Sequence, residues 1–573
     1  MDTSSHRPRL VLLAVLALAI APYFIGLGAS SLWDSNEAFY AESPREMIES
    51  GDYINPSFNY QPRFNKPPLS YWVVAGFYKL FGVSEWAERL SIALGALILI
   101  ALTFALGRAV FSVEAGLLAA IALAANPRVL MFSRRIFIDV YLAMFMGLSL
   151  LLFVLAERQP RRRRLWLALM YASVGLGVMT KGPVAAVLAG AAFFVYLLAT
   201  RSASRIREMM LPVGVLIIAI IVLPWYAAVY GQHGWSYIES FLVGDNLSRY
   251  TQPVWGPRRS VLFYLPVLAG DLFPWSVFLF AACLSALRGF IARRRLRANE
   301  TPRADDRMSM EGSYDERGAI LWAWVAVIVV FFSFSSNKED LYILPVYPVA
   351  SALVGGFVGR LVSESTGTRR WFLWPGGITG AALAVLGGGV LYVLKEAPSS
   401  YSLAGTTAIG MTVLAGGLVA MVAVVANRRL AAVLVIAMSV AALNWILVGR
   451  TLPDFERYKP VREYCEIIRE RAGPDAMVGY YRFASPSMVF YLRRPVFEYY
   501  REEDLLAAMA SGREVYCLMT ARDYAELAQR LPRAARVLAT RPVFQVKLGS
   551  ILDRAELPQV VLISNGSGAA ASQ

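Results

Sequence analysis

Charged residues, histidine and cysteine are all scarce in this chain of 573 residues. Only 17% of the residues are charged, whereas a soluble chain carries roughly 25%. The two histidines, His6 and His233, do not lie near a second metal ligand, and the three cysteines lack metal-ligand spacing. No nucleotide-binding motif is present. The sequence therefore argues against a soluble nucleotide-dependent enzyme and against a metal site built on histidine or cysteine.

Apolar residues and arginine are abundant instead. Hydrophobic residues make up 57% of the chain, the mean hydropathy is +0.49, and the net charge is +15. A basic balance can indicate nucleic acid, anionic lipid or an anionic substrate as partner. Here the arginines cluster in short loops between apolar runs, which is typical of the cytoplasmic loops of membrane proteins. We therefore expect membrane lipids as partners and no nucleic acid.

Apolar runs of about 20 residues, the length that crosses a bilayer as a helix, recur along the first 450 residues. The first extends from about Leu10 to Gly28, and the others centre near Leu97, Ala120, Gly147, Ala172, Gly190, Ile218, Phe273, Ile328, Ala352, Val385, Leu414 and Met438. This pattern predicts a mainly α-helical membrane protein with about 13 transmembrane helices. If the N-terminus lies on the inner side of the membrane, all the arginine-rich segments lie on the inner side as well. These segments are 158–164, 201–207, 293–297, 360–370 and 428–429.

Three regions outside the apolar runs then lie on the outer side: the loops 29–85 and 231–259, and the C-terminal tail. In the tail, strands are expected at 476–481, 496–500 and 514–519, and helices at 486–493, 502–510 and 521–531. This alternation predicts a small parallel α/β domain. We therefore expect a transmembrane domain over residues 1–450 and an extracytoplasmic α/β domain over 451–573, with docking or lid function favoured over catalysis.

Candidate chemistry lies in the first outer loop. Asp34 and Glu37 follow the first apolar run directly, and Lys66 precedes Pro67 and Pro68. The plainer interpretation is an acidic interfacial helix and a lysine that extends to the membrane surface. The alternative is a general base beside the bilayer and a cation, held rigidly by the two prolines, that faces a lipid phosphate. The residues alone leave both interpretations open.

Several short motifs resemble the polyprenyl-phosphate-dependent glycosyltransferases of the GT-C fold, and most closely the aminoarabinose transferase and protein mannosyltransferase-related branch. They occur in order from about residue 30 to residue 350, and thus cover the membrane half. They are Asp34 with Glu37, Lys66-Pro67-Pro68, Asp139 after Arg135-Ile136-Phe137-Ile138, Thr180-Lys181-Gly182-Pro183, and Lys338 followed by Tyr342-Ile343-Leu344-Pro345.

The resemblance implies transfer of a sugar from a polyprenyl-phosphate carrier to an envelope acceptor, which could be lipid A, a glycan, another lipid or a protein. It implies a bacterial cytoplasmic membrane location with the active site on the extracytoplasmic face. It makes Asp34 the candidate base and Asp139 a second essential acid. Some relatives have Asp-Glu at the positions where this chain has Asn36 and Glu37, so Glu37 is an alternative base. The resemblance assigns substrate and phosphate binding to Lys66, Arg249, Lys338 and Tyr342.

The same resemblance also marks a departure from the family pattern. Aminoarabinose transferases have a metal pair, a glutamate before the lysine and a histidine in the later loop, and here these positions are Asn65 and Asn246. Neutral amides are poor zinc ligands. We therefore expect no zinc at this position and no cofactor, without excluding another divalent metal. The main alternative function is a flippase or transporter of a lipid-linked sugar, and a non-catalytic membrane scaffold is a third interpretation.

Overall fold

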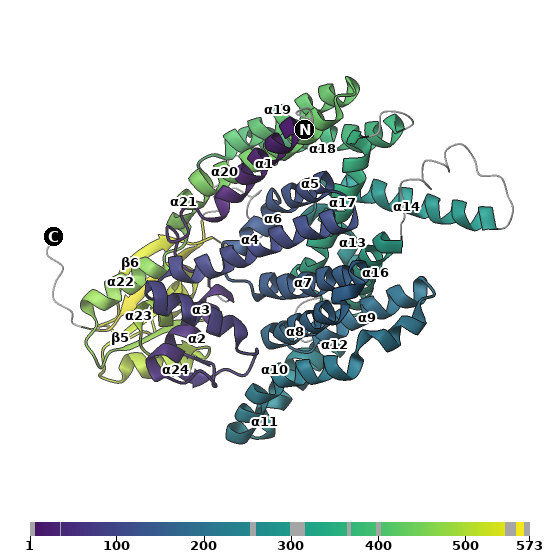
Figure 1. Cartoon of the computed structure of the whole chain (residues 1–573). Helices are drawn as coiled ribbons and strands as arrows, with labels where there is room; N and C mark the ends of the chain where they lie inside the picture. The colour runs from purple at the N-terminus through teal and green to yellow at the C-terminus, as the bar shows by residue number, and fades with distance from the viewer. Residues whose placement is uncertain are drawn as a thin grey trace.

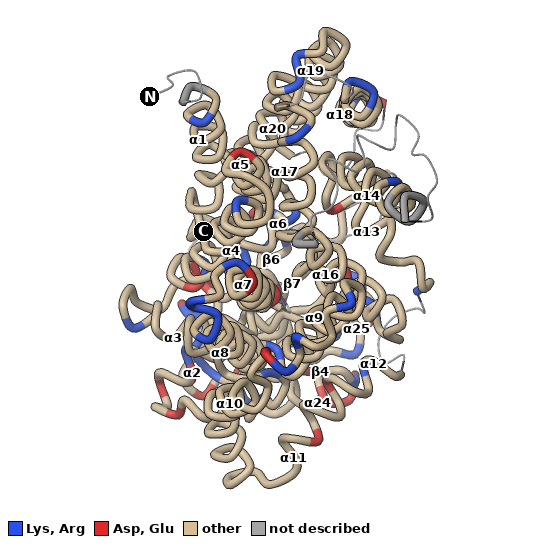
Figure 2. The backbone as a smooth tube through the Cα atoms, turned by 45° about the vertical axis from the view of Figure 1, so that its right-hand side comes forward, with Lys and Arg blue, Asp and Glu red and all other residues tan. Residues whose placement is uncertain are grey.

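The computed structural model describes residues 6–34, 36–252, 259–297, 316–363, 368–396, 403–544 and 557–566. Long helices fill one part of the molecule, and a five-stranded sheet with its own helices lies at one end of them (Figure 1). Charged side chains are sparse along the long helices, as Figure 2 shows. The prediction of a mainly α-helical membrane protein with a small C-terminal α/β unit is confirmed.

The helices follow the apolar runs of the sequence. From the N-terminus to residue 251 the α-helices are α1 (His6–Ile20), α2 (Asn36–Ser50), α3 (Leu69–Phe81), α4 (Glu85–Val110), α5 (Val113–Ala124), α6 (Pro127–Ser133), α7 (Ile138–Arg158), α8 (Arg163–Lys181), α9 (Val184–Ala199), α10 (Leu211–His233), α11 (Trp235–Ile238) and α12 (Arg249–Thr251). The π-helical segment η4 (Glu239–Ser248) joins α11 to α12. A short hairpin of β1 (Ser57–Phe58) and β2 (Gln61–Pro62) lies between α2 and α3.

Further helices of the membrane half follow from residue 264 onward. They are α13 (Tyr264–Asp271), α14 (Ser276–Arg297), α16 (Glu316–Ser333), η6 (Asp340–Val346), α17 (Tyr347–Ser363), α18 (Arg369–Glu396), α19 (Thr406–Val425) and α20 (Arg429–Ile446), after which the chain turns through η7 (Leu447–Thr451), α21 (Leu452–Phe455) and η8 (Glu456–Tyr458). Close helix packing is visible where α17 meets α5. A Cβ atom on Gly355 would lie 2.3 Å from the Ala115 carbonyl oxygen, so only glycine permits this approach.

The expected number of spans is not confirmed. Among the described residues seven helices are long and apolar enough to cross a bilayer, or nine if two bent pairs each count as one span. The bent pairs are α5 with α6 and the 261–271 segment with α14, bent by 66° and 118°. Apolar helices at 8–23, 184–199 and 318–333 are shorter than 18 residues. A count from apolar runs cannot separate a full span from a short or broken helix, because both have the same composition.

The C-terminal sheet has the strand order β4-β3-β5-β7-β6, with β3 (Met477–Tyr481), β4 (Phe497–Tyr499), β5 (Val515–Thr520), β6 (Arg536–Pro542) and β7 (Gln559–Ser564). Its helices are α22 (Val461–Arg471), α23 (Ser487–Leu492), α24 (Glu502–Ala510) and α25 (Ala521–Leu527). Side chains of β5 alternate between two apolar layers: Tyr516 packs with α22 and α23, and Cys517 packs with α24.

The expectation of a purely parallel sheet is wrong, because one of the five strands, β7, runs antiparallel to its neighbours. The strands β3, β4 and β5 are parallel, as predicted, but β7 pairs antiparallel with both β5 and β6. The tail also contacts the first loop directly. The Tyr491 hydroxyl accepts a hydrogen bond from the Leu32 N–H at 2.7 Å, and Asn59 donates to the Val496 carbonyl at 2.8 Å. The sheet unit is therefore docked on the loop that carries Asp34. The domain boundary at residue 450 stays a prediction.

Candidate functional site

A cavity of about 810 Å³ lies where the polar loops meet the ends of the long helices. Six segments distant in sequence line it: the start of α2, the turn before Pro67, the start of α7, the end of α8 with the start of α9, the η4–α12 segment, and the chain from 331 to 342. Its polar and charged lining residues are Asn36, Tyr40, Lys66, Asp139, Lys181, Asp245, Asn246, Arg249, Tyr250, Ser335, Asn337, Glu339 and Tyr342. Apolar side chains from the helices complete the wall. We call this the large cavity.

One wall of the large cavity holds two cations on a single carboxylate. Lys66 Nζ lies 2.9 Å from Asp245 Oδ2, and Arg249 Nη2 lies 3.0 Å from Asp245 Oδ1. The Lys66 and Asp245 side chains are mostly buried. Burial lowers the pKa of Lys66 to about 8, although the neighbouring Asp245 carboxylate opposes this shift. Sequence reasoning missed Asp245, which could have been found as the acid four residues before Arg249 on a helical segment.

A second ion pair joins two helix ends across the large cavity. Asp139 is in the first turn of α7, where the helix dipole favours a carboxylate, and Lys181 is in the last turn of α8. The Lys181 ammonium donates to Asp139 Oδ1 and lies 5.1 Å from the centre of the Tyr342 ring. Gly182 ends α8 with a φ of +93°, and a Cβ there would meet the Phe241 ring at 2.6 Å. The Lys181-Gly182 motif thus serves the site and also ends a helix.

The segment from 335 to 342 is attached to the backbone of α12. The Ser336 N–H donates to the Tyr250 carbonyl at 2.8 Å, and the Asn337 amide donates to the Arg249 carbonyl at 2.7 Å. This attachment holds Tyr342 and Glu339 at the large cavity. Lys338 does not line it, because its ammonium donates to the Ser335 carbonyl within the same turn. The structure therefore brings together Lys66, Asp139, Arg249 and Tyr342 of the predicted site residues, and excludes Lys338.

Asp34 and Glu37 also lie outside the lining of the large cavity. The Glu37 carboxylate is held by Arg89, with Nε to Oε1 at 2.8 Å, and accepts the Trp33 N–H at 2.7 Å. Asp34 Oδ1 accepts the Ser487 N–H from the C-terminal unit at 2.9 Å. Burial raises the pKa of Asp34 to about 6, against the hydrogen bonds from Ser487 and the charge of Lys459. The residue of this loop that lines the large cavity is Asn36.

The buried Glu37–Arg89 pair leads to a first prediction. The side chains are 1% and 2% exposed, so Glu37→Gln leaves a buried guanidinium without its counter-charge. Removing one member of a buried pair typically costs about 3–5 kcal/mol. We expect Glu37→Gln to lower the thermal unfolding midpoint of the purified protein while donor binding in the large cavity persists. An unchanged midpoint together with lost turnover would instead favour Glu37 as a catalytic group.

Among the described residues, no group of three or more histidine, cysteine, aspartate or glutamate side chains is placed to hold a metal ion. Asn246, which stands at the family's metal position, donates its side-chain amide to the Phe241 carbonyl at 2.8 Å. The Lys66–Asp245–Arg249 ion pairs join the two loops that carry Asn65 and Asn246. The absence of zinc from this position stays a prediction.

Comparison with known proteins shows which proteins this chain is similar to. Residues 65–227 match the family described as dolichyl-phosphate-mannose-protein mannosyltransferase. An uncharacterized protein of Aquifex aeolicus is 30% identical over 368 residues, which are 64% of this chain and 66% of that protein. The undecaprenyl phosphate-alpha-4-amino-4-deoxy-L-arabinose arabinosyl transferase of Edwardsiella ictaluri is 28% identical over 353 residues, 61% of this chain and 59% of the relative. The chain spans less than two thirds of the length of these curated relatives.

A solved structure extends the likeness to the whole chain. ArnT from Cupriavidus metallidurans, in a crystal structure bound to undecaprenyl phosphate, superposes with a TM-score of 0.77. The alignment covers 98% of this chain and 99% of that chain at 22% sequence identity, so it shows a common fold. The sheet unit is included in this coverage. The chain is thus a multi-pass membrane protein with the same fold as that structure, and it is similar in sequence to the mannosyltransferase family model and to the arabinosyl transferases.

Proposed function

We propose that this protein transfers a glycosyl group from a polyprenyl-phosphate-linked sugar to an envelope acceptor on the outer face of the bacterial cytoplasmic membrane. The observation that carries the proposal is the large cavity, which combines three cations, Tyr342 and the ion-paired Asp139 and Asp245 with apolar walls. A lipid-linked sugar phosphate has the matching parts: an anion, a reactive sugar carbon and an apolar chain. The undecaprenyl-phosphate carrier of the relatives is the first donor to test, and the acceptor can be lipid A, a glycan, another lipid or a protein.

The cation pair is suited to the carrier phosphate. Lys66 and Arg249 both form ion pairs with Asp245, so a phosphate can take the place of this one carboxylate without leaving either cation unpaired. Tyr342 lines the same cavity and can add a hydroxyl donor. As the bond between the sugar and the phosphate breaks, negative charge grows on the phosphate oxygens, and positively charged donors already in place stabilise it. Lys66, Arg249 and Tyr342 thus keep the roles that the family resemblance implied.

We assign the base to Asp139 in place of Asp34. Three acids line the large cavity, and one of them, Asp245, is held by the phosphate cations. Asp139 faces the cavity from a helix N-terminus, whose dipole favours a carboxylate, and Lys181 fixes its orientation. It can accept the acceptor's proton while the anomeric carbon passes through an oxocarbenium-like state. Glu339, an exposed lining residue, is the second candidate.

A test of the proposed function uses the purified full chain in nanodiscs. Undecaprenyl-phosphate-linked 4-amino-4-deoxy-arabinose, the donor named for the relatives, is supplied with an envelope extract, and release of undecaprenyl phosphate is followed. The proposal expects release that depends on both the protein and the extract. A donor that crosses the bilayer of proteoliposomes with its sugar bond intact would favour the flippase alternative.

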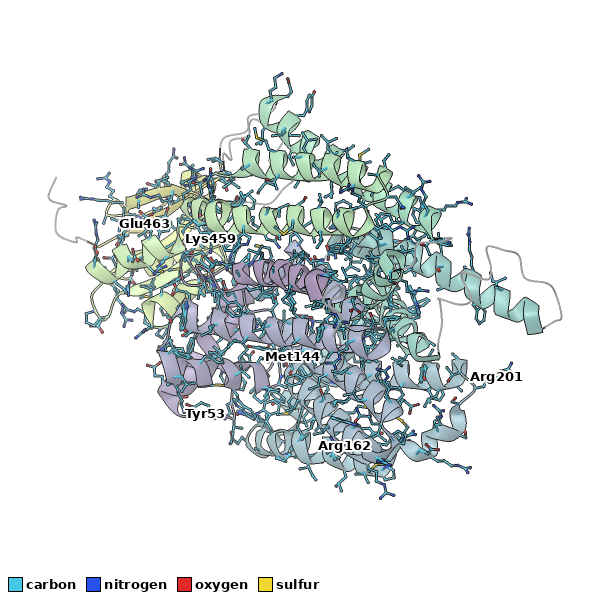
Figure 3. All side chains as sticks on the ribbon, turned by 45° about the horizontal axis from the view of Figure 1, so that its top comes forward. Tyr53, Met144, Arg162, Arg201, Lys459 and Glu463 are labelled. Carbon is cyan, nitrogen blue, oxygen red and sulfur yellow. The ribbon has the colours of Figure 1, made fainter. Side chains whose placement is uncertain are left out.

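The outer location of the site leads to a topology prediction. The arginine-rich loops predict that Lys66 lies outside and Arg162 inside. In Figure 3, Arg201 lies far from Lys459 of the docked tail, toward the other end of the molecule. A cysteine introduced at position 60, an exposed part of the first loop, is expected to react with a membrane-impermeant reagent in intact cells. A cysteine at position 162 is expected to react only after lysis. The reverse pattern would place the large cavity on the cytoplasmic face.

The pKa of Lys66 leads to a pH prediction. With a pKa of about 8 the lysine is protonated below about pH 8, and a phosphate binds the protonated form better. Carrier affinity is therefore expected to be roughly constant below pH 8 and to fall above it, by up to about tenfold per pH unit. Binding of undecaprenyl phosphate to the protein between pH 6 and pH 10 measures this. Lys66→Arg, which stays charged, should shift the fall to higher pH, and a wild-type affinity that is flat to pH 10 would contradict the assignment.

A further inference from the structure

A second cavity lies at the junction between the long helices and the C-terminal sheet unit. Its volume is about 50 Å³, several times the roughly 10–15 Å³ that one water requires. Its charged and aromatic lining includes Trp33, Arg89, Arg134, Arg135, Glu456 and Lys459, and none of these lines the large cavity. We call it the junction cavity. Lys459 is labelled in Figure 3, where the C-terminal elements meet the helices.

Two cations in the junction cavity face one aromatic ring, and only Lys459 has a carboxylate within ion-pair distance among the described residues. The Arg135 guanidinium carbon lies 4.1 Å and Lys459 Nζ lies 4.5 Å from the centre of the Trp33 ring. Arg135 has no ion pair among the described residues, and its Nε is buried without a hydrogen-bond partner. Lys459 donates to the Ser31 carbonyl, and its nearest carboxylate, Glu456, is 3.8 Å away. Donor groups are therefore available for an anion.

Burial of these cations has an electrostatic cost that an anion would offset. Burial lowers the pKa of Arg134 to about 10 and that of Lys459 to about 8. It also lowers the pKa of Arg135, against the nearby Glu37 carboxylate. Glu37 is already paired with Arg89, so it does not neutralise the other cations. A bound anion would raise the pKa of all three groups again, because a nearby opposite charge favours the charged form.

The surroundings of the junction cavity indicate which kind of anion. Gly26 and Leu27 follow α1, Arg134 and Arg135 follow α6, and Lys459 follows the segment after α20. The cavity therefore lies at the ends of three apolar helices, the level at which lipid headgroups lie. Basic side chains between helices at this level bind anionic headgroups. The first loop lines both cavities, Trp33 the junction cavity and Asn36 the large cavity.

We propose that the junction cavity binds the phosphate group of an anionic membrane phospholipid, at a site separate from the large cavity. Arg135 and Lys459 supply the hydrogen-bond donors, and Arg134, whose guanidinium is held by the carbonyls of Pro22, Ile25 and Gly26, adds positive charge. The first loop is therefore held between a carrier site on one side and a lipid phosphate on the other. This proposal does not depend on which sugar or acceptor the large cavity serves.

Lipid binding to the purified full chain, followed by native mass spectrometry, tests the proposal. The probes are dioleoyl phosphatidylglycerol and dioleoyl phosphatidylcholine, which share acyl chains and differ in net charge. We expect one phosphatidylglycerol to bind more tightly than phosphatidylcholine, and Arg135→Gln or Lys459→Gln to weaken it by about tenfold or more, as expected for a lost charge-assisted hydrogen bond. Arg522→Gln, a charge loss at a largely exposed side chain on α25, and Lys66→Gln are expected to leave this binding unchanged.

Other results would overturn the proposal. Wild-type affinity in both Arg135→Gln and Lys459→Gln would remove the junction cavity as the site, and loss of binding in Lys66→Gln alone would move the lipid to the large cavity. Displacement of the lipid by millimolar inorganic phosphate would assign the cavity to free phosphate instead of a lipid. If either variant fails to fold, the thermal unfolding midpoint of the wild-type protein is measured instead. Phosphatidylglycerol is expected to raise this midpoint above the value measured with phosphatidylcholine. Equal midpoints with the two lipids would overturn the proposal.

Discussion

Asp139→Asn is expected to lower the transfer rate by about 10²–10⁴-fold, the usual range for a lost general base. Carrier binding should survive or strengthen, because the neutral amide no longer offsets the positive charge of Lys181 in the large cavity. The two quantities are measured on the same nanodisc preparation, as release of undecaprenyl phosphate from the donor and as equilibrium binding of undecaprenyl phosphate. This separation of rate from binding distinguishes a base from a phosphate ligand.

The controls for Asp139 are the other candidate acids. Asp34→Asn is expected to keep most of the transfer rate, because Asp34 lies against Ser487 and not in the large cavity. Glu339→Gln is expected to have a smaller effect than Asp139→Asn, since Glu339 is exposed and no ion pair orients it among the described residues. The opposite result would be a normal transfer rate in Asp139→Asn and no transfer in Asp34→Asn. It would show that the first loop moves into the cavity during the reaction and that Asp34 is the base.

Loss of both phosphate cations should have the largest effect on carrier binding. Charge-assisted hydrogen bonds contribute about 1.5–3 kcal/mol each, so Lys66→Ala and Arg249→Ala should each weaken undecaprenyl phosphate binding by roughly 10–150-fold. The double variant should be weaker still, though less than additive, since the two cations share one anion. The transfer rate should fall with affinity, because the same donors stabilise the leaving phosphate.

Asp245→Asn is the matched control, because it removes the carboxylate that both cations contact in the empty cavity. Carrier affinity should stay the same or increase in this variant, since the phosphate no longer competes with a protein carboxylate. If Asp245→Asn weakened binding as much as Lys66→Ala did, Asp245 would be required to position the cations. If Lys66→Ala and Arg249→Ala both bound the carrier normally, the phosphate site would lie elsewhere.

Much of the fold could be predicted because its signals are local. Apolar runs identify the helices, and alternation along the tail identified β3, β4 and β5 within one residue or so of their bounds. The strand β6 was missed because it is partly exposed, with the sequence RVLATRP, whereas β7, QVVLIS, is apolar and buried and its signal was overlooked. The number of spans was not predictable, because α5 with α6 is an apolar stretch broken at Asn126, which caps α6. Composition does not record where such a helix bends.

The site was only partly predictable for a different reason. Lys66, Asp139 and Arg249 stand in short motifs that can be recognised in a single sequence, and the fold brings all three to one cavity. Asp34 and Glu37 also stand in a motif, but their orientation is set by contacts distant in sequence. The docked tail contacts Asp34 through Ser487, and Arg89, fifty-two residues away, holds Glu37. A sequence motif does not record such contacts. Asp245 was missed because its importance lies entirely in contacts with Lys66, 179 residues distant, and with Arg249.

Mass spectrometry of the cell envelope tests the central claim most directly, because neither the sugar nor the acceptor has to be identified before the measurement. Envelopes are compared from cells that contain the wild-type protein, the Asp139→Asn variant at equal abundance, or no protein. We predict that an envelope component gains the mass of one sugar residue in the first case and lacks it in the other two. Identical envelopes in all three cases, with the wild-type protein present and folded, would contradict the assignment of this chain as a glycosyltransferase.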